Sequence, residues 1–172
     1  MNEITLPDLL LLSDYGGDYH TYMEAVYAVF DNDFIKSKPE FRGKKLRLKY
    51  HPETHGKAYT FYHMTHEGKD EANRQPDLRR CERMPWARPV IENCDAWSLK
   101  VWRQIRNGKN RICIWLELAG EPDYFIVLDD RKEYILPWTA FVLQYNHEKR
   151  KKQKEYEEYL NSLKKQEPPS DA

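Results

Sequence analysis

Apolar residues recur at intervals of three and four near the start of the chain. From Tyr19 to Phe34 they would form one face of a helix. Asp18 has the right side chain to cap its first turn, and Pro39 ends any helix that reaches it. We therefore predict an N-terminal helix over residues 19–35 that packs on the core.

Two segments after this helix have the pattern of strands. Residues 44–50 alternate strictly between basic and apolar side chains, as in a half-buried strand. Residues 58–64 are rich in aromatic side chains, and the link between the two segments is too short for a parallel crossover. We predict an antiparallel pair of strands, with His63 near the end of the second.

Prolines interrupt the middle of the chain. Pro76 suits the first turn of a short helix over residues 76–82. The residue before a proline avoids helical backbone, so Pro85 and Pro89 predict extended backbone at the positions that precede them and exclude a long helix. A further short helix is predicted over residues 97–105, where apolar residues recur at helical spacing.

Three apolar segments then predict an antiparallel meander over residues 111–118, 124–128 and 133–142. The first two are almost continuously apolar, so both of their faces are expected to be covered. Residues 147–165 are highly charged and have a narrow apolar stripe, which is typical of a helix at the surface.

These elements predict one α+β domain over residues 1–165. It would have an N-terminal helix, a curved, mostly antiparallel sheet of about five strands and a charged C-terminal helix, followed by a disordered tail over residues 166–172. No apolar run is long enough to span a bilayer and no signal-peptide pattern is present, so we predict no membrane partner. Three cysteines without CxxC spacing predict a reduced, cytoplasmic protein with small buried thiols.

The formal net charge is zero, but the charges are separated along the chain. Residues 1–35 hold seven acidic side chains and no Lys or Arg, whereas residues 36–50 hold seven Lys or Arg against one acid. Residues 74–111 hold ten against four. If the basic segments share one face they would attract polyanions; the alternative is a mixed, solvated surface.

Metal binding is the first chemistry to test, because four histidines lie close together in sequence. They lack the helical His spacing or CxxC-like intervals of zinc sites, so we predict no metal site and no cofactor. A Ser nucleophile between glycines and a Gly-rich phosphate loop are also absent from the sequence. The histidines considered are His51, His55, His63 and His66.

Metal-free cleavage of RNA fits the remaining residues, because the ribose 2′-hydroxyl is itself the nucleophile. The protein must then supply proton transfer and cations for the phosphorane-like transition state. His63 or His66, together with Glu67, can transfer protons. The cations and stacking surfaces predicted to bind substrate or phosphate are Arg79, Arg80, Arg83, Arg88, Arg111 and Trp86.

A structural interpretation of the same residues stays open. The arginines could form salt bridges with Asp77, Glu82 and Glu92, and His63 could be a hydrogen-bonded core histidine. Either arrangement would also explain why so many polar groups lie in one stretch.

Several motifs resemble a widespread family of small bacterial proteins that has no securely assigned activity. The likeness spans nearly the whole chain and implies membership of that family, but it carries no function with it. The motifs are DLRRCER at 77–83, the pattern W-x-R-P-x-I-E-N at 86–93, RICIWLE at 111–117 and WTA at 138–140.

The layout is also similar to the phage-linked members of the barnase, EndoU, colicin and RelE-like ribonuclease group, which are metal-independent RNases. This resemblance implies that His63 is the base or acid, that Arg80 and Arg83 bind phosphate, and that the hydroxyl of Thr139 contacts the scissile phosphate. The chain departs from the pattern because no second histidine is near Thr139; His147 is the nearest.

The sequence therefore predicts a metal-independent endoribonuclease-like protein, a toxin or anti-phage defence effector. Its partners would be single-stranded RNA and a cognate inhibitor or defence-system protein. The alternative is a non-enzymatic accessory of a phage or defence system that binds nucleic acid or protein. The test between them is whether one concave site gathers the predicted catalytic residues His63, Glu67, Arg80, Arg83 and Thr139.

Overall fold

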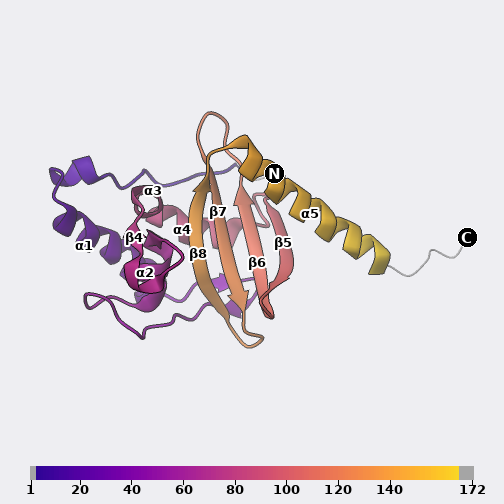
Figure 1. Cartoon of the computed structure of the whole chain (residues 1–172), viewed down its shortest axis with the longest axis horizontal. Coiled ribbons are helices and arrows are strands. Elements are labelled where there is room, and N and C mark those ends of the chain that lie inside the picture. Colours follow the sequence, from indigo (N-terminus) through magenta and orange to yellow (C-terminus); the bar gives the residue numbers. More distant parts are fainter. Residues whose placement is uncertain (1–2, 167–172) are drawn as a thin grey trace, which may run out of the picture.

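The computed structural model describes residues 3–166, in which helices come first and the main sheet follows (Figure 1). A short turn, η1 (Leu12–Tyr15), precedes helix α1 (Tyr19–Phe30), which continues as the π-helical segment η2 (Asp31–Lys36). The Asp18 side chain accepts a hydrogen bond from the His20 N–H and so caps α1. The predicted N-terminal helix is confirmed.

Four strands form one antiparallel sheet in the order β5-β6-β7-β8, and the fold is of the α+β class as predicted. The predicted meander is confirmed, but the main sheet has four strands where about five were expected. The strands are β5 (Lys100–Arg106), β6 (Lys109–Leu116), β7 (Asp123–Asp130) and β8 (Ile135–Leu143).

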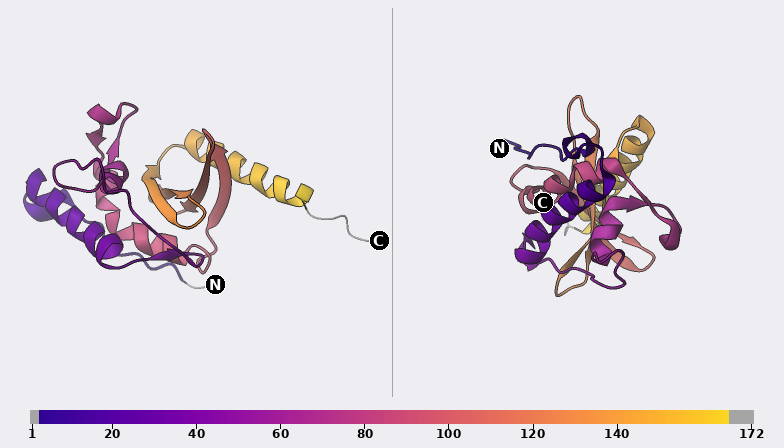
Figure 2. Two further views of the ribbon diagram at one scale, coloured as in Figure 1. Left: turned by 90° about the horizontal axis from the view of Figure 1, so that it is seen from below. Right: turned by 90° about the vertical axis from the view of Figure 1, so that its left-hand side faces the viewer.

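Both faces of this sheet are covered, as the apolar strands predict (Figure 2). The helical layer packs on the inner face, where Ile112, Ile114 and Ile126 are fully buried. Helix α5 (Asn146–Gln166) lies on the outer face and contributes Tyr156 and Tyr159 to a smaller cluster around three aromatic side chains of the strands. The predicted C-terminal helix is therefore confirmed.

The antiparallel pair of strands predicted over residues 44–50 and 58–64 was mostly wrong. The first strand is confirmed only at its start, where β2 (Lys44–Lys45) pairs with β1 (Glu40–Phe41) and Leu46 forms a single parallel bridge to Ile135. Residues 59–65 form helix α2 (Tyr59–Thr65). Because Phe61 and Met64 recur at helical spacing, a helix buries both against the core, and this tertiary packing overrides the aromatic strand pattern.

The predictions around the prolines were partly wrong. Helix α3 (Leu78–Glu82) confirms the short helix, but α4 (Met84–Asn93) is helical where extended backbone was expected. Pro85 lies in the first turn of α4, where its missing N–H has no partner to lose. Pro89 lies inside α4, and the burial of four apolar neighbours offsets its cost: Trp86, Ala87, Val90 and Ile91.

The helix expected over residues 97–105 was also wrong, because most of that segment is strand β5. The spacing of its apolar residues fits both a helix and a strand. Pairing with β6 buries Trp102 almost completely. Three small elements complete the fold: β3 (His66–Glu67), which pairs with β4 (Gln75–Pro76), and the turn η3 (Glu71–Asn73) between them.

Among residues 3–166, no helix combines the length and the apolar character needed to cross a bilayer. Cys81, Cys94 and Cys113 are buried and unpaired, as predicted, and burial raises the thiol pKa of Cys81 to about 12 and of Cys94 to about 11. The tail predicted from residue 166 falls outside the described residues from 167 onward, and Gln166 itself ends α5.

We predict that Phe61→Ala destabilises the protein by about 3–5 kcal/mol, because the fully buried ring of Phe61 joins α2 to Tyr27 and Phe30 of α1. Urea unfolding followed by circular dichroism measures the loss. Leu163→Ala, on the exposed part of α5, is the control and should change stability by less than about 0.5 kcal/mol. Equal losses for the two variants would contradict the packing of α2 on α1.

Candidate functional site

A β-bulge in strand β8 organises the candidate site. Thr139 pairs with Val127 and Pro137 pairs with Leu128, so Trp138 is the extra residue of β8 at this point. A bulge leaves its extra residue outside the regular ladder and redirects its groups. The carbonyl oxygen of Trp138 therefore lies free to accept a hydrogen bond from another element.

His63 of α2 binds this carbonyl. Its Nδ1 lies 3.0 Å from the Trp138 oxygen, and the imidazole ring packs 4.5 Å from the Trp138 ring, centre to centre. Because a carbonyl oxygen can only accept, Nδ1 carries the proton and Nε2 of the neutral ring has a free lone pair. The bulge thus fixes both the tautomer and the orientation of His63.

The other side of His63 faces a small pocket. His63 Nε2 lies 3.9 Å from Oε1 of Glu71, and the hydroxyl of Tyr59 donates to the same oxygen at 2.6 Å. An imidazole, a carboxylate and a phenol are thus gathered in one place. The pocket, here named the His63 pocket, encloses about 210 Å³ and is lined by Pro52, Thr54, Tyr59, Tyr62, His63, Glu71, Ala72 and Arg74.

Burial sets the protonation of these groups. It lowers the pKa of His63 to about 4, with help from the positive charge of Arg74, and the hydrogen bond to Trp138 opposes it only in part. Burial and the Glu71 carboxylate raise the pKa of Tyr59 to about 12, while the Tyr59 hydrogen bond lowers the pKa of Glu71. At neutral pH the pocket therefore holds a neutral imidazole beside an ionised carboxylate.

Two guanidinium groups converge beside this pocket. Arg74 and Arg80 both donate to the carbonyl oxygen of His66, at 3.2 and 2.8 Å. Arg80 also donates to Thr139 Oγ1 at 3.2 Å and to the Asp77 carboxylate at 3.2 Å. Nε of Arg74 is buried and has no hydrogen-bond partner. Such a pair of adjacent cations attracts anions.

Three of the five residues predicted as catalytic therefore meet at one junction, namely His63, Arg80 and Thr139. Glu67 is exposed on β3 and acts on Arg80 only through its charge. Arg83 lies elsewhere, with its guanidinium 5.2 Å above the Trp86 ring and its Nη1 donating to the carbonyl oxygen of Arg79.

The residues predicted to bind substrate are spread more widely. Trp86 is only 4 % exposed and donates from Nε1 to the Pro7 carbonyl, so no face of its ring is free for a base. Arg88 bonds to Glu92 and Ser37, and Arg79 is exposed on α3. The structural interpretation of the arginines holds for three ion pairs: Arg80–Asp77, Arg83–Glu82 and Arg88–Glu92.

Arg111 packs on the Trp138 ring. Its guanidinium is 4.3 Å from the centre of that ring, and its Nη1 is buried without a partner among residues 3–166. Together with Thr139, Arg106 and Lys152, these two residues line a groove of about 240 Å³ on the outer face of the sheet. Trp138 thus lines this groove and also contacts His63.

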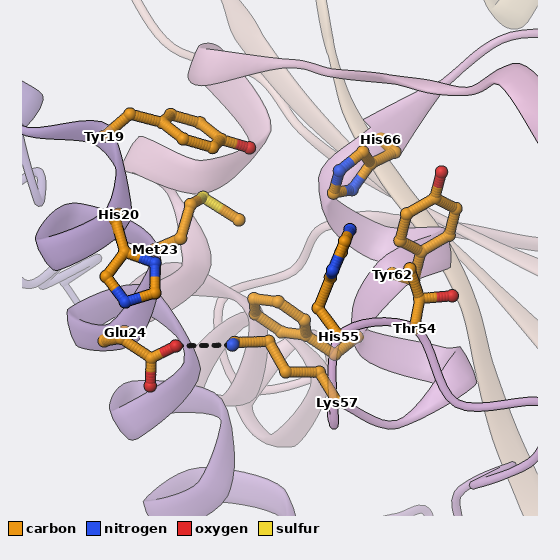
Figure 3. A pocket seen from close by; sticks show the side chains of 10 residues that line it. Tyr19, His20, Met23, Glu24, Thr54, His55, Lys57, Tyr62 and His66 are labelled. Atoms are coloured by element: carbon orange, nitrogen blue, oxygen red, sulfur yellow. Dashed lines mark hydrogen bonds and ion pairs between the residues drawn. The ribbon is translucent and has the colours of Figure 1, made fainter.

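A third pocket, of about 290 Å³, lies between α1 and α2 and contains three histidines (Figure 3). His55 and His66 point toward each other, and His20 lies across from them on α1 beside the Glu24–Lys57 ion pair. In the part of the chain that the structure describes, no three His, Cys, Asp or Glu side chains are arranged to hold a metal ion.

Sequence reasoning missed four members of the site: Tyr59, Glu71, Arg74 and Trp138. Arg74 entered the sequence analysis only through the count of basic residues over positions 74–111, and the loop over residues 65–73 was given no functional role. The β3–β4 pairing returns this loop to α2 and so places Glu71 and Arg74 beside His63. Short-range spacing carries no signal for that return.

Comparison with known proteins gives no further guide, since no protein-family model, no curated protein and no solved structure matches this chain. The chemistry of the site therefore rests on its own geometry.

We predict that the protein loses stability as the pH falls from about 6.5 to about 4. Burial lowers the folded-state pKa of both His63 and His66 to about 4, so in this window the unfolded chain binds protons that the folded chain does not. Each imidazole should account for about 3 kcal/mol of the loss. The unfolding midpoint should depend less on pH across this range in the double variant His63→Asn/His66→Asn than in the wild type. Parallel profiles for the variant and the wild type would contradict the assignment.

Proposed function

We propose that the protein is a metal-independent endoribonuclease that cuts single-stranded RNA at the His63 pocket. One observation carries the proposal. The free Nε2 of a neutral imidazole, an ionised carboxylate and two converging guanidinium groups come together from separate segments of the chain: His63, Glu71, Arg74 and Arg80. The imidazole can transfer a proton and the guanidinium group of Arg74 can stabilise charge at phosphorus, while Arg80 positions the elements around them.

In this mechanism Nε2 of His63 takes the proton of the ribose 2′-hydroxyl. The 2′-oxygen then forms a bond to phosphorus as the bond from phosphorus to the 5′-oxygen breaks, and the 5′-oxygen takes a proton from solvent. The products are a 2′,3′-cyclic phosphate and a 5′-hydroxyl. Glu71 lies 3.9 Å from Nε2 and stabilises the imidazolium that forms.

Arg74 and Arg80 have different roles in this proposal. Arg74 lines the pocket, and its hydrogen bond to the His66 carbonyl uses Nη1, so Nη2 is placed to bind the phosphate oxygens. Arg80 already bonds to Asp77, to the His66 carbonyl and to Thr139. It is a positioning residue, because it holds β8 against α3 beside the Trp138 carbonyl that fixes His63.

The cellular role, the location and the partners expected from the sequence belong to the same proposal. A ribonuclease of this kind would act in the cytoplasm as a toxin or an anti-phage effector. It would then need a cognate inhibitor or a partner protein of a defence system to protect the cell's own RNA.

Binding without cleavage is the second candidate, and the carboxylate partners of the arginines favour it. Arg80, Arg83 and Arg88 each form an ion pair within the protein, so none of them is left free for catalysis. A non-enzymatic accessory of a phage or defence system would bind nucleic acid or an acidic protein through the other basic residues.

We predict that the purified protein cuts single-stranded RNA in the presence of EDTA and that His63→Ala lowers the rate about 100- to 10,000-fold, while RNA affinity is nearly unchanged. Gel analysis of labelled RNA, with identification of the 2′,3′-cyclic ends, measures this. The control is His20→Ala, an exposed histidine outside the His63 pocket. Cleavage only after addition of zinc or manganese would point to the histidines of Figure 3 instead, and intact RNA under both conditions would favour binding without cleavage.

We further predict that Arg74→Gln lowers kcat/KM by about 100-fold, because a charged donor to the phosphate is lost. Arg150→Gln on α5 removes the same charge at an exposed position and should leave kcat/KM unchanged. Steady-state kinetics on a short labelled RNA distinguish the two variants. The role given to Arg74 fails if both behave like the wild type.

A further inference from the structure

Basic residues are frequent from Lys45, the last residue of β2, to Tyr50, and residues 45–50 are here named the basic strap. Its backbone is fixed at both ends. The N–H of Arg47 donates to the Ile135 carbonyl at 2.9 Å, and the N–H of Lys49 donates to Thr60 Oγ1 at 2.9 Å. The strap therefore has a defined course along the start of β8 and onto α2.

Side chains alternate along the strap, although only Lys45 belongs to a strand and Leu46 forms a single β-bridge to Ile135. Leu46 is buried and Leu48 is half-buried, whereas Lys45, Arg47 and Lys49 are exposed. Alternate residues of an extended chain project to the same side at intervals of about 6.6 Å. The strap thus presents a row of three cations to solvent.

These three cations are unpaired. Within residues 3–166, no carboxylate oxygen lies within 4.0 Å of Lys45, Arg47 or Lys49, whereas the neighbouring Lys44 pairs with Asp130. Unpaired, exposed cations on a fixed backbone retain their full attraction for an external polyanion.

Aromatic and apolar surface accompanies the cations. Arg47 lies over the Tyr134 ring at 5.3 Å, and the Tyr50 ring is 44 % exposed. A hollow of about 330 Å³ runs along the strap, with an apolar floor and basic walls. It is lined by Phe34, Ile35, Lys38, Lys45, Leu46, Arg47, Leu48 and Tyr50. Single-stranded nucleic acid is bound by this combination of cations for phosphates and apolar or aromatic surface for unpaired bases.

The strap ends at the His63 pocket. Nζ of Lys49 lies 4.1 Å from the centre of the Tyr59 ring, and Tyr59 lines that pocket and bonds to Glu71. A polymer bound along the strap therefore reaches Tyr59, which lines the same pocket as His63.

We propose that the basic strap binds the phosphate backbone of single-stranded RNA, with unpaired bases on the apolar floor of the hollow, and that the bound strand enters the His63 pocket at Lys49. The proposal rests on the proposed function for the fate of the RNA, whereas binding along the strap can be measured without cleavage. Double-stranded RNA keeps its bases paired and is not expected to use the floor.

The test uses the inactive His63→Ala protein and a fluorescent single-stranded oligoribonucleotide of about ten nucleotides. Affinity is measured by anisotropy at several salt concentrations, before and after the triple change Lys45→Gln/Arg47→Gln/Lys49→Gln. Each phosphate contact contributes about 0.7 to the slope of log affinity against log salt, so the slope should fall by about 2. If the variant and the starting protein bind RNA equally at 1 M salt, a slope lower by about 2 makes the affinity of the variant about 100-fold weaker at 0.1 M salt.

A matched control removes the same charge elsewhere. Arg150→Gln/Lys151→Gln/Lys154→Gln changes three exposed cations of α5 and should leave the slope and the affinity nearly unchanged. Circular dichroism and thermal unfolding check that both triple variants are folded, which is expected because all six side chains are exposed.

Three outcomes would overturn the strap as the RNA-binding site: an unchanged slope in the strap variant, equal losses in both triple variants, or displacement of RNA by polyglutamate at the same concentration of charge. The proposed function fails separately. Specific binding at the strap together with no cleavage by the wild type supports the strap and refutes the ribonuclease. Cleavage that is unaffected by the strap variant refutes the strap alone.

Discussion

The contact between helix α2 and edge strand β8 holds the helical layer to the sheet and fixes the candidate site. Phe61 and Met64 bury one side of α2 in the core, while His63 on another side bonds to the carbonyl of Trp138. That carbonyl is available because Trp138 is the extra residue of a bulge. A single irregularity in an otherwise regular ladder thus connects the two halves of the molecule and orients the imidazole.

Burial then decides what the polar groups at this contact can do. An imidazole removed from water stays neutral near pH 7 and keeps Nε2 as an acceptor. The adjacent Glu71 stays ionised because it reaches solvent and accepts from Tyr59. Two groups with separated protonation states, next to converging guanidinium groups, form an arrangement suited to proton transfer at a phosphate ester.

The basic residues of the chain divide into two classes. Arg80, Arg83 and Arg88 bind carboxylates or carbonyls of the protein and hold α3 and α4 in place. Among the residues that the structure describes, 3–166, the exposed cations of the basic strap have no carboxylate partner. Exposed ion pairs contribute little stability, so a row of unpaired cations costs the fold little and leaves a surface available to a polyanion. The zero net charge conceals this division.

The sequence by itself determined helix α1, strands β6 to β8 and helix α5, because their apolar patterns are long. Of the residues predicted to be catalytic, His63, Arg80 and Thr139 lie together in the structure. Tertiary structure alone decided that residues 58–64 are mainly helical where a strand was predicted, and that residues 97–105 are mainly a strand where a helix was predicted. Short aromatic runs fit both the helical and the strand period, and long-range burial selects between them. Tertiary packing also accommodates Pro89 within α4, and the pairing of β3 with β4 brings Glu71 and Arg74 close to His63. Which charges are paired depends on distances between segments far apart in the chain, and local spacing does not contain those distances.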